Sequence, residues 1–487
     1  MNYISLLFFV FLAVLFLLYY VLPKKAQWPI LLIGSLVFYA FASWLALPVL
    51  VLEILVTYVL ARRMEKSRRK KGIIAAIILM HLAALILLMY VPAWHEGFLQ
   101  GGIAAKLIAP LGISYFTLIM IGYGIDVYRE QIPAEKNFAK LVLFGLYFPS
   151  ITQGPLNRYP DLSSQLTKEH PYDSKKIFHG LVRFGLGAFK KMVVANRIAA
   201  YIAAVHANEK AAGVFVLLGI LLFFLQLYAD FSGCMDIVLG VSEMFGIDLP
   251  ENFRQPFFSR SVAEFWRRWH ITLGNWLQDY LYYPVSMCPA AKRFIKNGPG
   301  KKKSRIRIVS CLSFFLLWMV MAVWHGPQIG FVFLGIQYAI VFIVTYLLGP
   351  TSKRFASNHP KLEENGFWKF FQRARTVILI WPVFLFAPTL SELSASLGRI
   401  FTNFQAAKLF QGGLFKFDLD AVQWILLFIG FLTMLIISNI EVRKEAKITD
   451  LVLAQKLPVR ILIYWFALIM ILLSLSIQNT EFIYAQF

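Results

Sequence analysis

The chain has 487 residues, of which 59% are hydrophobic, 16% aromatic and only 15% charged. A water-soluble core of this length cannot bury that much apolar surface, so the composition excludes an ordinary soluble enzyme and indicates a membrane protein. The net charge of +22 does not indicate nucleic acid as a partner, because the basic residues gather in short clusters between apolar segments, where membrane topology places them. We expect these clusters to set the orientation and to contact anionic membrane lipid.

Apolar segments follow one another along the chain and predict a multi-pass α-helical protein. They cover residues 3–22, 28–45, 46–61, 72–94, 108–128, 141–155, 177–205, 213–234, 306–324, 328–348, 373–390, 422–440 and 460–478. Several are too short or too broken to be simple spans. Segment 141–155 ends with Pro149, Gly154 and Pro155, which free backbone groups that hydrocarbon cannot satisfy. We therefore expect it to be re-entrant or buried among other helices.

The basic clusters predict the orientation in the cytoplasmic membrane. Residues 24–25, 62–71 and 129–140 each follow an odd-numbered segment, and all three agree if they face the cytoplasm. The basic stretches 292–307 and 443–447 should be cytoplasmic by the same rule. The N-terminus and the C-terminus are then both expected on the extracytoplasmic side. We interpret the polar stretch 349–370 as a solvated cytoplasmic loop.

Polar residues are interleaved with aromatic ones between Asp230 and Tyr283. On one continuous helix, Trp266, Trp269 and Trp276 would fall near one face. This pattern alone favours an interfacial helix at the cytoplasmic surface over a ligand site.

His325 is the main candidate for chemistry. It follows a strongly apolar stretch that ends at Val323, and Gly326 and Pro327 then break the helix. An ionisable ring at such depth is costly unless it faces a cavity or a partner, so intramembrane histidines are candidates for function. His81 also lies in an apolar run, and we interpret it as a packing histidine. Position alone supports the two interpretations equally for His325.

A neutral imidazole can accept a hydroxyl proton while the oxygen attacks a carbonyl, which is the chemistry of acyl transfer. The sequence contains no Gly-x-Ser-x-Gly, His-Glu-x-x-His or Walker motif, and no Gly-x-Gly-x-x-Gly before a helix. Direct transfer between two bound substrates is therefore favoured over a serine or cysteine triad. The three scattered cysteines show no metal-ligand spacing, and we predict neither a metal nor a cofactor.

A series of motifs, in order, resembles the bacterial membrane-bound O-acyltransferase (MBOAT) family over about residues 105–345. These motifs are Leu111–Phe116, Ile125–Arg129, Gln153–Pro155, Asp230–Gly233, Pro250–Phe253, Glu264–His270, Asp279–Leu281 and Trp324–Gly326. The resemblance is closest to the AlgI-like branch, which acts in alginate O-acetylation, and next to the DltB-like branch, which acts in teichoic-acid D-alanylation. It implies an all-α polytopic membrane protein with a ring of transmembrane helices around a central tunnel, plus re-entrant and interfacial helices.

The resemblance also implies a division of the chain and of the roles in its site. N-terminal transmembrane helices (1–104) would precede the catalytic core (105–345), and C-terminal transmembrane helices (346–478) would follow it. His325 matches the catalytic histidine of the family, and His270 matches its second histidine, nearer the cytoplasmic mouth of the tunnel. The residues expected to line or support the tunnel are Asp230, Asn252, Trp269 and Trp324.

Residues 479–487 resemble the C-terminal tyrosine motif of such acylation systems, in which Tyr484 would be a transient acyl acceptor. Seven extended residues reach roughly 23 Å, enough to fold back into an extracytoplasmic funnel. A frayed aromatic terminus is the competing interpretation. The resemblance further implies acetyl-CoA or another acyl thioester as the donor substrate, and an extracytoplasmic SGNH-type acyltransferase as the partner that receives the group.

The sequence therefore predicts an acyl-CoA-dependent O-acetyltransferase that modifies an exported or cell-wall polysaccharide. D-alanyl transfer from a carrier protein to teichoic acid is the alternative within the same family. A transporter or flippase is a third hypothesis, because broken helices and an intramembrane histidine also suit that class. No inverted repeat is visible in its favour.

Overall fold

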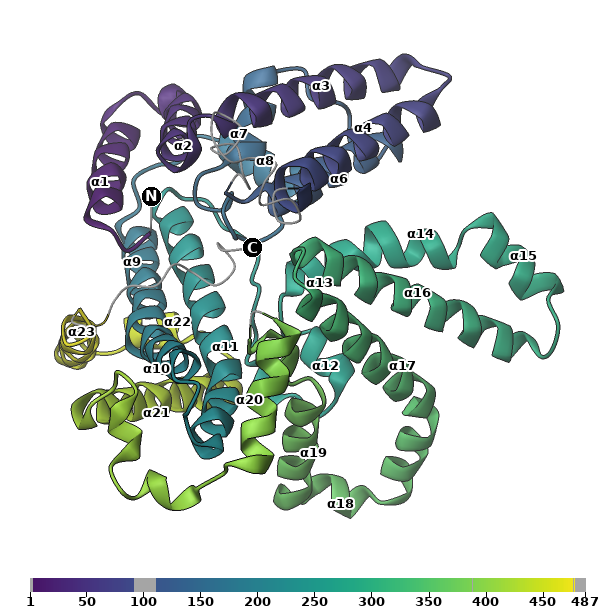
Figure 1. Ribbon diagram of the computed structural model, residues 1–487. Helices are drawn as coiled ribbons and strands as arrows, with labels where there is room; N and C mark the ends of the chain where they lie inside the picture. Colours follow the sequence, from purple (N-terminus) through teal and green to yellow (C-terminus); the bar gives the residue numbers. More distant parts are fainter. Residues whose placement is uncertain (1–2, 92–110, 388, 476, 478–487) are drawn as a thin grey trace. The chain divides into compact units, whose positions relative to one another are not determined.

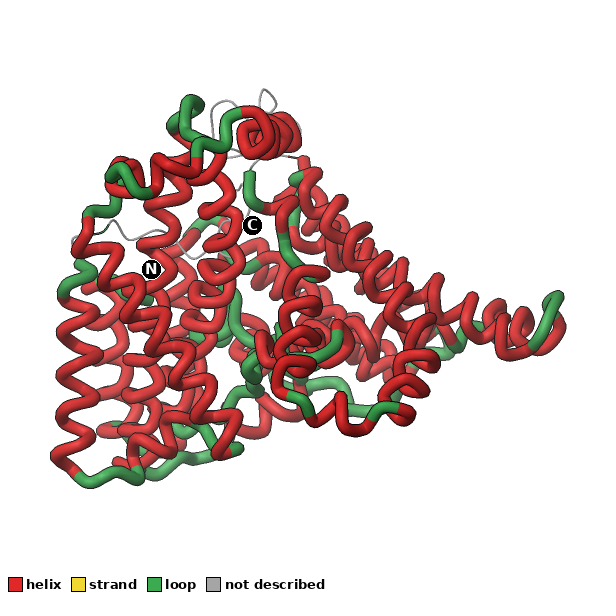
Figure 2. Tube along the Cα trace, turned by 90° about the horizontal axis from the view of Figure 1, so that it is seen from below, coloured by secondary structure: helices red, strands yellow, loops and turns green. Residues whose placement is uncertain are grey.

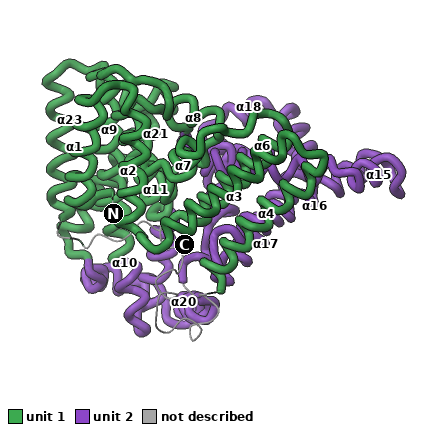
Figure 3. The backbone as a smooth tube through the Cα atoms, turned by 90° about the horizontal axis from the view of Figure 1, so that it is seen from above, with its two compact units in different colours: residues 1–200, 225–250, 419–487 green, residues 201–224, 251–418 purple. Residues whose placement is uncertain are grey.

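The computed structural model describes residues 3–91, 111–387, 389–475 and 477. Regular structure in these residues is helical, apart from an isolated antiparallel β-bridge between Phe253 and Trp269, and Figure 2 shows helices joined by loops. The prediction of an all-α chain is confirmed. Figure 3 shows the two compact units of the chain: unit 1 comprises Met1–Ala200, Leu225–Pro250 and Leu419–Phe487, and unit 2 comprises Tyr201–Phe224 and Glu251–Asp418.

Unit 1 contains helices from both ends of the chain (Figure 1). They are α1 (Leu6–Val21), α2 (Gln27–Ser43), α3 (Ala46–Lys66), α4 (Lys70–Leu85), α6 (Ile113–Tyr128), α7 (Phe138–Leu146), α8 (Tyr159–Thr167), α9 (Ser174–Phe189), α21 (Ala421–Lys444), α22 (Ile448–Leu453) and α23 (Leu457–Leu472). Two helices, α10 (Asn196–Ala207) and α11 (Gly213–Met244), have residues in both units. Short π-helical segments follow α4 and α9, at Ile86–Tyr90 and Lys190–Ala195.

Six helical segments in the described part of the chain are long and apolar enough to cross a bilayer. They are Lys24–Ser43, Lys70–Tyr90, Gly213–Met244, Lys302–His325, Ile329–Asn358 and Ala421–Lys444. Helices α1, α6 and α23 are apolar but shorter. The chain is thus a multi-pass membrane protein, as its composition predicts.

The segment 141–155 is buried, as its prolines and glycine predict. Helix α7 ends at Leu146, and residues 147–157 continue without a helix, all of them buried. The hydroxyl group of Tyr3 donates to the Pro149 carbonyl at 3.1 Å, and the Phe148 N–H donates to the Ser35 hydroxyl at 3.1 Å. Neighbouring helices therefore supply hydrogen bonds that hydrocarbon could not.

Helices α9 and α11 pack unusually closely through two pairs of glycines. A Cβ atom built on Gly180 would lie 2.5 Å from the carbonyl oxygen of Gly240, and one built on Gly187 would lie 2.4 Å from that of Gly233. Seven residues separate the glycines on each helix, so both pairs lie along one antiparallel contact. Small residues at this spacing let two membrane helices approach backbone to backbone.

Ion pairs reinforce the same helix pair. Arg183 contacts Asp236 at 3.3 Å and Glu243 at 2.9 Å, and Lys190 contacts Asp236 at 2.6 Å. All four side chains are largely buried. Because α11 is long and apolar enough to span the membrane, its acidic groups need these opposite charges, without which burial would be very costly.

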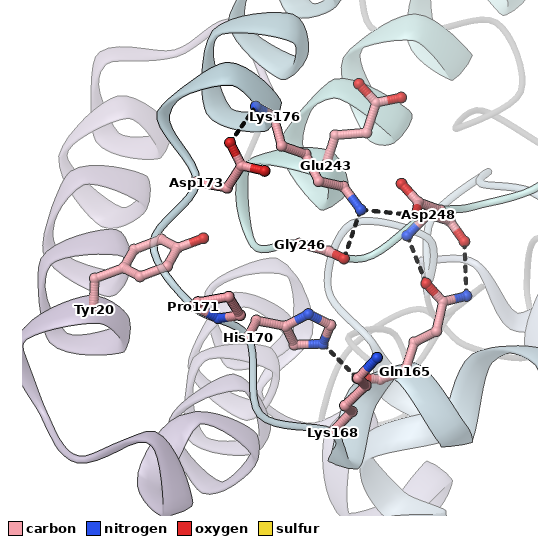
Figure 4. A pocket seen from close by; sticks show the side chains of 10 residues that line it. All are labelled: Tyr20, Gln165, Lys168, His170, Pro171, Asp173, Lys176, Glu243, Gly246 and Asp248. Carbon is pink, nitrogen blue, oxygen red and sulfur yellow. Dashed lines mark hydrogen bonds and ion pairs between the residues drawn. The ribbon is translucent and has the colours of Figure 1, made fainter.

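One end of this helix pair carries a polar pocket of about 270 Å³ (Figure 4). The side-chain amide of Gln165 forms two hydrogen bonds with the backbone of Asp248, accepting from its N–H at 2.8 Å and donating to its carbonyl at 3.0 Å. Gly246 has a φ of +83°, and a Cβ there would lie 2.7 Å from the ring of His170. The ammonium of Lys176 donates to the Gly246 carbonyl and the Asp248 carboxylate. These hydrogen bonds link α9 to the loop that follows α11.

Unit 2 contains the remaining helices. They are α12 (Val262–Trp266), α13 (Ile271–Leu277), α14 (Tyr283–Ser286), α15 (Pro289–Asn297), α16 (Lys302–His325), α17 (Ile329–Asn358), α18 (Pro360–Glu364), α19 (Gly366–Leu379) and α20 (Leu390–Thr402). Helices α16 and α17 form an antiparallel hairpin, in which Gly335 fits against Ala322 and a Cβ on Gly335 would lie only 2.6 Å from the Ala322 methyl group. Trp318 packs on Tyr338 one turn further along, with ring centroids 5.3 Å apart.

The prediction of a loop at 349–370 is wrong, because most of this stretch is helical. Helix α17 continues through Pro350 to Asn358, and α18 and α19 follow after short breaks. A proline removes one backbone donor and crowds the carbonyl four residues earlier, at a cost of about 3 kcal/mol. A long helix can therefore bend or lose stability at a proline without ending there. The chain does break at Pro360, which starts α18.

Candidate active site

His325 is the last residue of α16. Gly326 follows it with φ 149° and ψ 176°, a conformation that is essentially restricted to glycine. The helix therefore ends directly after the imidazole, as the sequence predicts. The residue is 8% exposed, and its ring stacks on Phe331 of α17 with centroids 5.4 Å apart and meets the neighbouring Trp324 edge-on at 4.7 Å.

His270 lies where the prediction of one continuous helix fails. Helix α12 ends at Trp266 and α13 begins at Ile271, and between them His270 adopts a left-handed conformation with φ 47° and ψ 50°. Non-glycine residues rarely occupy this region, at a cost of about 1–2 kcal/mol. Trp266 and Trp276 therefore do not share a face of one helix, and the prediction of a single continuous helix over this stretch is wrong.

Asn252 holds this break in place from a distant part of the sequence. Its side-chain oxygen accepts hydrogen bonds from the N–H of Thr272 at 3.0 Å and from the Thr272 hydroxyl at 2.7 Å. Its backbone carbonyl accepts from the N–H of Ile271 at 3.1 Å. Asn252 is 1% exposed. The helical pattern of residues 262–277 gives no sign of these partners, which explains the error.

Trp269 extends the same contact into an aromatic cluster. It forms the β-bridge with Phe253, and the two rings meet edge-on with centroids 5.1 Å apart. Its ring also stacks on Phe265 at 5.4 Å and contacts Phe224 at 5.7 Å. The backbone before His270 is thus fixed by buried aromatic packing, which limits how far the imidazole can move.

The two histidines converge on Trp324. The ring of His270 lies 6.3 Å from that of Trp324, which in turn lies 4.7 Å from His325. His270 is 4% exposed and belongs to none of the candidate spans. Burial lowers the pKa of His270 well below its ordinary value, and the neighbouring His325 adds to this effect. His270 is therefore a neutral imidazole at physiological pH, with one ring nitrogen that donates a hydrogen bond and one that accepts.

Asp230 belongs to unit 1, where its carboxylate contacts the ammonium group of Lys191 at 2.6 Å. Both side chains are only 2% exposed. Lys191 was not among the predicted site residues, although a lysine inside an apolar segment is itself a sign of a buried acidic partner. Tyr484 lies outside the described residues.

His81 is a packing histidine, as predicted. It is fully buried, with one ring nitrogen 2.7 Å from the carboxylate of Glu53 and the other 2.9 Å from the hydroxyl of Thr57. Its hydrogen bonds within unit 1 account for both nitrogens.

Comparison with known proteins decides the family. The family model of the membrane-bound O-acyltransferases matches residues 127–380, which are just over half of the chain. The protein belongs to the MBOAT family. The matched range includes both histidines of the site, together with Asp230, Asn252 and Trp324. The resemblance found from the sequence motifs is confirmed.

Curated proteins similar to the chain include some named for O-acetylation and some named for D-alanylation. The chain is 31% identical over 366 residues to the probable alginate O-acetylase AlgI of Pseudomonas syringae, covering 72% of this chain and 67% of that protein. It is 29% identical over 399 residues to the peptidoglycan O-acetyltransferase of Helicobacter pylori, covering 73% and 72%. It is 31% identical over 248 residues to the teichoic acid D-alanyltransferase of Bacillus subtilis, covering 48% and 58%. The matches span about two thirds of the length of the first alginate relatives.

Proposed function

We propose that this MBOAT protein moves an acetyl group from cytosolic acetyl-CoA across the cytoplasmic membrane, for O-acetylation of an exported or cell-wall polysaccharide. The observation that carries the proposal is the convergence of two buried histidines, His270 and His325, on Trp324 inside a member of this family. The relatives named for alginate and peptidoglycan O-acetylation support acetyl as the group and polysaccharide as the acceptor.

In the proposed reaction, His325 acts as the general base. Its imidazole takes the hydroxyl proton of Tyr484 while the phenolic oxygen bonds to the carbonyl carbon of the thioester. The carbon–sulfur bond then breaks, and the departing sulfur receives the proton from His325. The products are an acetyl ester of Tyr484 and a free thiol, and His325 returns to its neutral form. His270 would lie beside the incoming thioester, on the cytoplasmic side of a tunnel lined or supported by Asp230, Asn252, Trp269 and Trp324.

The second transfer would take place outside the cytoplasm. An SGNH-type acyltransferase partner would receive the acetyl group from Tyr484 and pass it to a hydroxyl group of the polysaccharide. Both termini are proposed to lie on that side of the membrane. Reporter fusions that are active only outside the cytoplasm, placed after Phe487, test this orientation, because no activity there would contradict the route.

Replacing His325 with alanine should abolish acetylation of the polymer while the protein stays in the membrane. A matched control is His206→Ala, because His206 is a histidine of unit 2 that is partly buried and packs on Phe386 with ring centroids 4.7 Å apart. The control should retain activity. Wild-type acetylation in the His325 variant would exclude this residue as the base.

Tyr484→Phe tests the relay separately. It removes only the phenolic oxygen, so transfer to the partner should stop while binding of acetyl-CoA is unchanged. Mass spectrometry of the C-terminal peptide from active membranes should find an acetyl group on wild-type Tyr484. An unmodified peptide together with full acetylation of the polymer would mean that the acyl group takes another route.

D-alanyl transfer to teichoic acid is the second candidate, and the relatives named teichoic acid D-alanyltransferase favour it. The two candidates differ in the donor. Purified protein should bind and consume acetyl-CoA under the first proposal, and an aminoacyl carrier protein under the second. Incubation with each labelled donor distinguishes them directly.

A further inference from the structure

Unit 1 contains an apolar groove of about 380 Å³ between α9, α21, α22 and α23. This volume is in the range of small-ligand sites, which is about 300–1,000 Å³. The residues that line it are almost all apolar, with α9 and α23 as its main walls. The principal wall residues are Phe178, Leu181, Gly185 and Phe189 on α9, and Tyr464, Ala467 and Ile471 on α23.

The length of the groove matches one leaflet of a bilayer. Its wall on α9 runs from Phe178 to Phe189, and eleven residues at 1.5 Å each extend about 16 Å. Half of a 30 Å hydrocarbon core is about 15 Å. A single acyl chain lying along α9 would therefore stay in contact with the protein from the headgroup level to the middle of the membrane.

One end of the groove carries a cation. The guanidinium group of Arg460 lies 5.5 Å from the ring centroid of Phe178 and 6.0 Å from that of Tyr464, and its Nε donates to the Tyr464 hydroxyl at 3.3 Å. Within the part of the chain that the structure describes, Arg460 has no carboxylate in ion-pair range. An arginine held by two aromatic rings keeps several N–H donors for an anion.

The rest of α23 also fits a lipid-facing role. Most of its side chains are exposed, and Met470 is its one buried residue in the described structure. A helix with so few protein contacts leaves a crevice against α9 that hydrocarbon fills in a membrane. The basic stretch 443–447, which should face the cytoplasm, precedes α23 and places the Arg460 end at the cytoplasmic leaflet.

We propose that this groove is a binding site for one anionic phospholipid of the cytoplasmic leaflet. An acyl chain lies between α9 and α23, and the phosphate group is bound by Arg460. The cytoplasmic leaflet supplies such anionic headgroups. The site does not depend on the acyltransferase proposal, since it lies in other residues and involves no transfer of a group.

The test uses the full chain, purified in mild detergent and studied by native mass spectrometry with added phosphatidylglycerol or phosphatidylcholine of the same chain length. The wild-type protein should retain one phosphatidylglycerol about tenfold more tightly than phosphatidylcholine. Arg460→Gln should remove this preference. Lys456→Gln is the matched control, because it removes an exposed cation four residues earlier and should leave the affinity unchanged.

A second variant tests the groove itself. A Cβ on Gly185 meets no atom within 4 Å, so Gly185→Leu should fill the groove without displacing the protein. It should abolish retention of both lipids while the far-ultraviolet circular dichroism stays unchanged. Equal retention of both lipids by the wild type, or undiminished retention by either the Arg460 or the Gly185 variant, would overturn the proposal. A groove covered by a second copy of the chain, seen as a lipid-free dimer, would do the same.

Discussion

Replacing Asn252 with alanine should loosen the turn that carries His270. The substitution removes the oxygen that accepts from the N–H and the hydroxyl of Thr272, at 3.0 and 2.7 Å. Thr272 is 7% exposed, so water does not readily replace either bond. A buried donor left without its acceptor costs about 1–3 kcal/mol, and two such donors give about 2–6 kcal/mol. The left-handed conformation of His270 then loses the contacts that oppose its strain.

Thr272→Val provides a graded comparison for this prediction. It removes only the hydroxyl donor and keeps the backbone bond to Asn252, so it should cost about 1 kcal/mol. Thermal unfolding in detergent, followed by tryptophan fluorescence at one fixed scan rate, should therefore rank wild type above Thr272→Val and Thr272→Val above Asn252→Ala. Acyl transfer should fall further in Asn252→Ala than the unfolded fraction explains. An Asn252→Ala protein with wild-type unfolding temperature and activity would refute the reasoning.

Three further predictions concern the helix pair and the buried charges. The Gly187→Ala protein should be about 1–3 kcal/mol less stable than the Gly185→Ala protein. Both substitutions raise helix propensity, but only Gly187→Ala forces a Cβ to within 2.4 Å of a backbone oxygen. Equal unfolding midpoints would contradict this packing. Lys191→Met should lower the free energy of unfolding by about 3–5 kcal/mol, because it removes the ammonium group that faces a buried carboxylate. The same substitution at Lys70 breaks an exposed ion pair and should lower it by at most about 1 kcal/mol. Burial lowers the pKa of His270, so below about pH 6.5 the unfolded chain takes up a proton there that the folded chain does not. The free energy of unfolding should therefore fall with acidification by up to about 1.4 kcal/mol per pH unit. His270→Asn, which tolerates the same backbone conformation, should reduce that slope in unfolding measured from pH 7 to pH 5, and an unchanged slope would contradict the assignment.

Local sequence patterns predicted the ends of helices better than the interruptions within them. The end of α16 at His325 follows from an apolar run and a glycine, both visible in the sequence. The break at His270 depends on Asn252, which is distant in the chain, so periodicity over residues 262–277 could not reveal it. The prediction missed the helix through Pro350 for a local reason. It took the proline as the end of a helix, whereas the long helix around it continues to Asn358.

The candidate site was predicted in part. The motifs named His270 and His325, and the structure brings them together around Trp324 within one unit. The partner of Asp230 was not predicted, although Lys191 interrupts an apolar segment and the Coulomb cost of such a charge requires a counterion nearby. Pairing intramembrane charges of opposite sign between segments would have found this contact from the sequence.

The charges between α9 and α11 also constrain how the protein is made. A ribosome produces Arg183 of α9, and Lys190 and Lys191 directly after it, before their partners Asp230, Asp236 and Glu243 exist. Before α11 is synthesised, moving this segment from the insertion machinery into the lipid is costly, because its cations lack their counterions. Lateral exit from the insertion machinery should therefore follow formation of the hairpin, and chains truncated between the two helices should be targets for membrane quality control.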